Sequence, residues 1–201
     1  MRPLTKTLIA TLVLAIVLAT GFATASARNI SVSERDFEEN FIPLNFSGGF
    51  GTVECEIILL GEFHVRTFPK VLKSLLGWVD HVTVTTPCRR GEATALRETL
   101  PWHLTYLGFV GRLPLIENLT VLLTGVSFRI REPTFGVQCL ARSTTESPIR
   151  VTATRNTATG AVTRLAPTGT IPCGSFSGSV SATSGTWTDL PRLNALTITL
   201  I

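Results

Sequence analysis

The sequence predicts a mainly β protein, an antiparallel β-sandwich that carries one short helix and two disulfides. Alternating apolar and polar residues recur in short runs, about every 10 to 15 residues, between turns rich in glycine and proline. This spacing is typical of sandwich domains. All four cysteines of the 201-residue chain lie beyond residue 50, which suits a protein of an oxidising compartment.

Residues 1–27 have the features of a secretory signal peptide. Arg2 and Lys6 precede an apolar run at 8–18, and Ala25-Ser26-Ala27 supplies a small-x-small cleavage pattern. The run is shorter than the ~20 residues that cross about 30 Å of hydrocarbon. We therefore expect a secreted, extracellular protein that is cleaved after Ala27 and keeps no transmembrane anchor.

The remainder indicates a polar, exposed lead-in at 28–50, with room for one strand, followed by a single β domain at 51–201. The clearest strand is 54–63, where Cys55, Ile57, Leu59 and Phe63 share one face. Similar alternation predicts strands at 81–86, 102–106, 126–131 and 135–139. Further strands are expected at 151–154 and 161–165, around a hairpin loop at 156–160, then at 176–183 and at the C-terminus.

One segment, 67–77, reads as a helix. Thr67 can cap its N-terminus, Pro69 suits the first turn, and Gly77 suits the C-terminal stop. Apolar residues recur there at helical spacing, which predicts one buried stripe: Val71, Leu72, Leu75, Leu76 and Val79.

The cysteines favour two sequential disulfides, Cys55–Cys88 and Cys139–Cys173. The members of each pair are 33 and 34 positions apart, and a proline precedes both Cys88 and Cys173. Strand parity also places Cys55 and Cys88 on the same buried face. Zinc is the rival use of four cysteines, but no pair has the C-x-x-C or C-x-x-H spacing of zinc sites. We expect no metal and no cofactor.

Charge gives one candidate binding surface. Without Arg2 and Lys6 the chain has 16 basic and 14 acidic side chains, a balance that favours neither nucleic acid nor an anionic membrane as an obligatory partner. Arg129, Arg131, Arg142 and Arg150 fall on outward positions of neighbouring predicted strands. They form a candidate site for an anionic surface polymer, although a solvated sheet face in an arginine-rich protein is the simpler interpretation.

No catalytic constellation stands out. The three histidines, His64, His81 and His103, lack metal-ligand spacing. Glu54 and Glu56 share a strand face, as paired glycosidase carboxylates can, but acidic outer faces of strands are common. The segment 174–178 has Phe176 where a G-x-S-x-G elbow needs serine.

The chain resembles a group of uncharacterised secreted β-rich proteins of high-GC actinobacteria. The resemblance rests on Leu60-Gly61-Glu62-Phe63-His64, on Thr99-Leu100-Pro101-Trp102-His103 with Tyr106, and on Ile198-Thr199-Leu200-Ile201. It implies a shared fold and no activity. Asn29, Asn45 and Asn118 begin glycosylation sequons, and the sequence does not say whether they are used.

The sequence thus favours a secreted, non-catalytic structural or binding module, which engages an anionic cell-surface polymer if it has a ligand. The alternative is an extracellular hydrolase whose site has no linear motif. A concave pocket with convergent polar groups would favour the hydrolase.

Overall fold

The computed structural model describes residues 29–201, except 50, 113, 114, 135, 174, 175, 183 and 191. Its elements, in chain order, are β1 (Asn29–Val32), β2 (Asp36–Gly48), β3 (Gly51–Phe63), β4 (Thr67–Pro69), β5 (Leu75–Arg89), β6 (Glu92–Ala95), the 3₁₀ turn η1 (Arg97–Thr99), β7 (Trp102–Arg112), β8 (Leu115–Thr124), β9 (Ser127–Glu132), β10 (Val137–Arg142), β11 (Ile149–Arg155), β12 (Val162–Cys173), β13 (Phe176–Ala182), β14 (Gly185–Asp189) and β15 (Ile198–Leu200). The predicted signal peptide, 1–27, lies outside the described residues.

The main sheet closes on itself. Its order is β13-β12-β11-β8-β7-β5-β3-β2-β14, and β13 also pairs with β2. Val180 lies opposite Phe46, and the nearby Gly185 of β14 lies opposite Phe41, so β13 and β14 together follow β2 along its length. All of these pairings are antiparallel. The mainly β, antiparallel prediction is confirmed, but one closed sheet replaces the expected two-layer sandwich.

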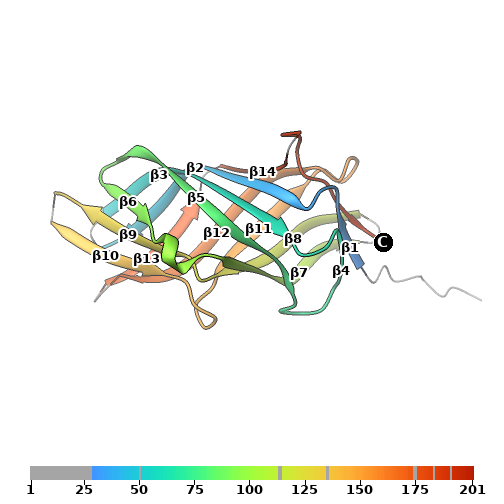
Figure 1. Cartoon of the computed structure of the whole chain (residues 1–201), viewed down its shortest axis with the longest axis horizontal. Coiled ribbons are helices and arrows are strands. Elements are labelled where there is room, and N and C mark those ends of the chain that lie inside the picture. The colour runs from blue at the N-terminus through green and yellow to red at the C-terminus, as the bar shows by residue number, and fades with distance from the viewer. Residues whose placement is uncertain are drawn as a thin grey trace, which may run out of the picture.

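A three-stranded sheet covers each end of the closed sheet. The sheet β10-β9-β6 lies at one end of the long axis, and β15-β1-β4 lies at the other (Figure 1). At the first end, the Phe128 ring lies 5.1 Å from Phe46 and 5.4 Å from Trp102, measured between centroids. At the second end, Ile30, Phe68 and Ile198 are buried. Both small sheets therefore bury their inner faces against the main core.

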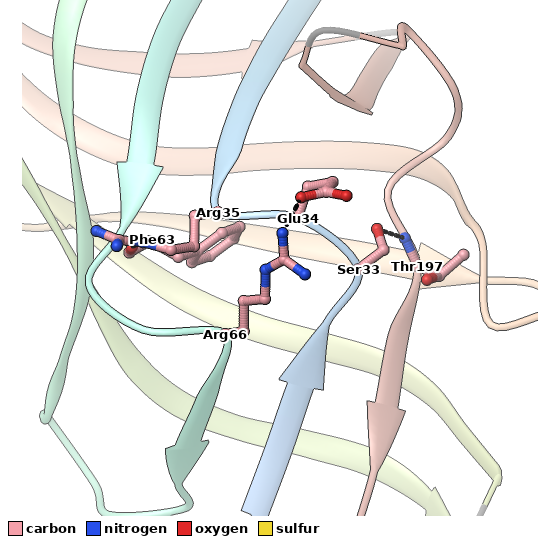
Figure 2. Close-up of polar contacts among 6 residues, drawn as sticks. All are labelled: Ser33, Glu34, Arg35, Phe63, Arg66 and Thr197. Atoms are coloured by element: carbon pink, nitrogen blue, oxygen red, sulfur yellow. Dashed lines mark hydrogen bonds and ion pairs between the residues drawn. The ribbon is translucent and has the colours of Figure 1, made fainter.

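Polar contacts at residues 33–35 join β1 to the main sheet (Figure 2). Arg35 donates from Nε to the Phe63 carbonyl at 3.1 Å, and Ser33 accepts the Thr197 N–H at 3.2 Å. Glu34 forms an ion pair with Arg66. These contacts tie β1, β3, β4 and the approach to β15 together, so the chain enters β2 in a defined direction.

The interior is packed and apolar. A cavity of about 20 Å³ remains between side chains such as Phe41, Leu59 and Val151, which is close to the space that one water molecule needs. Near β14, Trp187 packs against Phe37 and Phe63 with centroids 5.5 and 5.3 Å apart. The interior is therefore a filled core, as expected for a closed sheet of this size.

The predicted helix at 67–77 is wrong. The segment forms β4, a turn at Leu72–Lys73 and the start of β5. Leu76 and Val79 are buried, whereas Val71, Leu72 and Leu75 are exposed. A helix of about three turns is marginal by itself, and the long ladder between β3 and β5 outweighs it. This ladder requires glycine at position 77, because the Cβ of any other residue would lie 2.2 Å from the Glu62 carbonyl oxygen.

The expected exposed lead-in at 28–50 is corrected as well. Residues 29–48 form β1 and β2, with Ile30, Phe37, Phe41 and Phe46 in the core. The outward face of β2 carries polar and acidic residues, so the segment has a polar composition although every second side chain is buried. No helix among the described residues is long and apolar enough to cross a membrane.

Most predicted strand faces agree with the structure. Cys55, Ile57, Leu59 and Phe63 of β3 are buried, and β7 buries Trp102, Leu104 and Tyr106. The loop at 156–160 connects β11 to β12, and the Asn156 side-chain oxygen accepts N–H groups from Ala158 and Thr159. Ser127 lies opposite Arg142 on the outer side of β9, yet it is buried.

Candidate anion-binding face

Three of the four candidate arginines lie on the outer face of β9 and β10. In this ladder Arg129 lies opposite Leu140, Arg131 opposite Gln138, and Arg142 opposite Ser127. The inward residues Phe128, Ile130 and Ala141 are buried. Arg129 is thus two residues from Arg131 and diagonal to Arg142, and diagonal neighbours in such a ladder are about 7–8 Å apart. We call Arg129, Arg131 and Arg142 the arginine face.

The three guanidinium groups have different partners. Arg131 lies 3.7 Å from Glu92 of β6 in an exposed ion pair, a type that contributes little to stability. Arg142 donates from Nε to the Ser127 hydroxyl at 3.2 Å. Arg129 forms no ion pair with any residue that the structure describes. The face therefore retains donors that an incoming anion can use.

The arginine face borders a shallow open concavity of about 330 Å³. Arg129, Arg142, Gln138 and Leu140 line it, and Glu98 contributes a carboxylate at its edge. An extended acidic chain fits such an open surface better than an enclosed small molecule, since enclosed pockets bury most of a small ligand.

Arg150 lies outside this group. It belongs to β11 of the main sheet, where it pairs with Leu122 of β8 and Thr168 of β12. Its side chain is exposed, but its ladder is not that of Arg129 and Arg131. The sequence alternation correctly placed Arg150 on an outer face, and only the sheet assignment separates it from the others.

The first predicted disulfide is present. Cys55 of β3 bonds to Cys88 at the end of the neighbouring strand β5. Cys139 is buried on β10, beneath the arginine face. The side chain of Cys173 lies outside the described part of the chain, so the pairing of Cys139 with Cys173 stays a prediction.

The histidines and paired carboxylates lie apart. His64, His81 and His103 are exposed on β3–β4, β5 and β7, and no metal-binding group of three His, Cys, Asp or Glu side chains occurs among the residues described. Glu54 pairs with Arg89 at 3.4 Å, while Glu56 lies opposite Thr85. These residues do not converge with a histidine on one site.

The most perturbed acid is Glu39, which sequence reasoning missed. Its side chain points into the closed sheet between Phe37 and Phe41 and is 1% exposed. Burial raises the pKa of its carboxyl to about 8, because an apolar interior disfavours the charged form. The signal was its position, since it shares the parity of Phe37 and Phe41. A hydrolytic acid must reach its substrate, whereas this carboxyl faces the packed core.

A second charged side chain, Arg155, is also buried. It donates from Nη1 to the Ile116 carbonyl at 2.7 Å, and burial lowers its pKa. Arg155 ends β11, where the hairpin loop leads to β12, so the contact holds this end of the β8–β11 ladder together. Its role is structural.

Fold and site together define an all-β protein with a closed, up-and-down antiparallel sheet and an exposed arginine ladder over one end. Comparisons with protein-family models, with curated proteins and with solved structures found no match. Its function is therefore inferred from the geometry alone.

Proposed function

We propose that this protein is a secreted, non-catalytic binding module that holds an anionic polymer on the arginine face. The observation that carries the proposal is the exposed ladder of Arg129, Arg131 and Arg142, in which Arg129 has no ion-pair partner among the described residues. Guanidinium groups bind carboxylates and phosphates through two parallel hydrogen bonds, which suits them to repeated anionic groups.

The support beneath the face favours binding. Phe128 and Ile130 anchor β9 in the core while Arg129 and Arg131 point outward. Because their backbones are held in a ladder, less conformational freedom is lost when a ligand binds. Like charges on neighbouring positions also repel one another, and an anion relieves that repulsion.

We also infer that Cys139 and Cys173 form the second disulfide. The strand β10, which carries Cys139, contacts β12, which ends at Cys173. Such a bond would tie the arginine ladder to the main sheet. Peptide mapping of the unreduced protein should recover the linked peptides, and a mixed link between residues 88 and 139 would contradict the pairing.

Binding is tested with protein beginning at Arg28, using polyglutamate and polyphosphate as probes. The Arg129→Ala/Arg131→Ala variant should lose at least about tenfold in affinity, since charge-assisted hydrogen bonds contribute about 1.5–3 kcal/mol each. Arg150→Ala/Arg164→Ala is the matched control, because it removes two exposed arginines from β11 and β12.

Salt gives a second readout. Wild-type binding should weaken as the Debye length falls from about 10 Å at 0.1 M salt to about 3 Å at 1 M. Equal losses in both double variants would mean that net charge alone attracts the polymer. That result, or binding that ignores salt, would refute a site at the arginine face.

Export is tested separately. Intact-mass analysis of protein recovered from the medium should give a chain that starts at Arg28. Retention of the chain in the membrane fraction would contradict secretion.

A further inference from the structure

The connection between β4 and β5 exposes apolar side chains next to lysines. Val71, Leu72 and Leu75 are all exposed within five residues, and Leu72 is 60% exposed. Lys70 and Lys73 flank the first two, and they are the only lysines after Lys6. Turn tips usually carry glycine, proline, asparagine or aspartate, so two branched apolar residues here are unusual.

This loop is held in place by β7. Lys73 donates its backbone N–H to the Tyr106 carbonyl at 2.7 Å, and Tyr106 donates back to the Ser74 carbonyl at 2.9 Å. The Lys70 ammonium lies 5.1 Å from the centre of the Phe109 ring. The next residue, Val110, is exposed as well. Loop and strand together form what we call the lysine–apolar patch: Lys70, Val71, Leu72, Lys73, Leu75 and Val110.

Along the loop and along β7 the charged side chains are basic, and the exposed Glu117 of β8 lies next to the Val110 end of the patch. Between Glu62 and Asp80 the chain has no acidic residue, and β7 has none along its whole length. Arg66 forms an ion pair with Glu34 just before β4. Neither Lys70 nor Lys73 forms an ion pair with a residue that the structure describes. Exposed apolar side chains beside such ammonium groups are complementary to a surface that is apolar inside and anionic outside.

From this combination we propose that the lysine–apolar patch docks on an anionic lipid surface. Leu72 and Val71 enter the boundary between headgroups and acyl chains, while Lys70 and Lys73 contact lipid phosphates. Apolar burial and attraction to anionic headgroups together set the strength of such interfacial binding. In Figure 1 the loop after β4 lies at the opposite end from β9 and β10. The molecule can therefore bind lipid at this end while the arginine face stays accessible.

The proposal is tested by vesicle co-sedimentation. Protein beginning at Arg28 is used, because the apolar run at 8–18 would itself bind lipid, and every described element lies after that point. The probes are vesicles of phosphatidylcholine alone and of phosphatidylcholine mixed with phosphatidylglycerol. Wild type should partition to the mixed vesicles and only weakly to the neutral ones.

Two variants examine the two contributions. Val71→Ser/Leu72→Ser should lower partitioning to mixed vesicles at least about tenfold, because buried apolar area is lost. Its control is Leu193→Ser, a leucine 63% exposed in the connection from β14 to β15. Lys70→Gln/Lys73→Gln should cost about fivefold per lysine, against Arg150→Gln/Arg164→Gln as control. Thermal unfolding of each variant checks that the fold is intact.

Failure has a clear form. Absence of binding to mixed vesicles, or equal losses in the patch and control variants, would overturn the proposal. So would self-association of the wild type that Val71→Ser/Leu72→Ser abolishes, because a second copy would then cover the patch. Arg129→Ala/Arg131→Ala should leave vesicle binding intact, which separates this surface from the arginine face.

Discussion

Glu39 and Trp187 lie directly opposite each other on β2 and β14, and both side chains point into the closed sheet. Neither the carboxylate oxygens of Glu39 nor the indole Nε1 of Trp187 has a hydrogen-bond partner among the described residues. Leu59 lies opposite Glu39 on its other side, and Phe37 and Phe41 flank it. A carboxyl in such surroundings is stable only when it holds a proton.

This arrangement predicts stability that falls as pH rises. The pKa of Glu39 rises on folding from 4.5 to about 8, so the folded protein retains a proton that the unfolded chain releases. Its contribution is complete below about pH 4.5, declines above it, and is lost above about pH 8. Since one pKa unit corresponds to about 1.4 kcal/mol, the decline should amount to a few kcal/mol.

Urea unfolding between pH 4.5 and 8.5 measures this decline in wild type, Glu39→Gln and Glu38→Gln. We expect Glu39→Gln to remove most of it, because the amide does not ionise. Glu38 is the neighbouring residue on the outward side of the strand, so its variant should follow wild type. An unchanged slope in Glu39→Gln would show that other groups control the pH dependence.

The Cys55–Cys88 bond should stabilise the fold mainly through the unfolded chain. Its ends are 33 residues apart, and the chain-entropy model then gives about 3.5–4 kcal/mol. Cys55→Ser/Cys88→Ser should lower the free energy of unfolding by about that amount, measured by urea denaturation without reductant. Cys139→Ser/Cys173→Ser serves as the comparison. A loss below about 1 kcal/mol in the first variant would mean that residues of β3 and β5 stay close together in the unfolded chain even without the disulfide.

Phe128 should be the main link between the end sheet and the core. Phe128→Ala removes contacts with Phe46 and Trp102 and should cost about 3–5 kcal/mol in thermal or urea unfolding. Leu140→Ala changes an exposed residue of the same ladder, so it should stay within about 0.5 kcal/mol. Similar effects for the two variants would show that the end sheet unfolds independently.

Gly77 should tolerate no side chain. An added Cβ would lie 2.2 Å from the Glu62 carbonyl oxygen, which is backbone and has little room to move. We expect Gly77→Ala to destabilise by more than about 1 kcal/mol. Gly108→Ala is the control, since nothing lies within 4 Å of its added Cβ. If both variants unfold at the same temperature as wild type, the backbones of β3 and β5 can move apart at Gly77 with little loss of stability, which would contradict this prediction.

Some of these features could be predicted from local alternation. The burial of Ile57 and Leu59 on β3 and the outward positions of Arg129 and Arg131 on β9 follow from the two-residue period of a strand. The same parity pointed to the Cys55–Cys88 bond. Glu39 follows the same alternation with Phe37 and Phe41, but the polar composition of 28–50 conceals that strand.

The helix prediction failed because irregularities in the pairing of β5 bury apolar residues at a spacing that resembles that of a helix. Leu72, Leu76 and Val79 fit a helical stripe, yet Leu76 and Val79 are buried from an extended strand while Leu72 is exposed. Pairing of β5 with β3 and β7 supplies hydrogen bonds to partners far along the chain. Local spacing contains no information on those partners, so it could not decide between the two structures.

The sequence by itself determined which faces of β3, β7 and β9 are apolar and which two cysteines of the first half can meet, because both depend on backbone geometry over a few residues. Only the tertiary structure decided that the sheet closes, that β9 and β10 cover one end, and that Arg150 lies apart from Arg129. Closure joins Val180 to Phe46, residues from opposite ends of the chain. Its stability depends on the combined register and twist of all the intervening strands, which no single segment specifies.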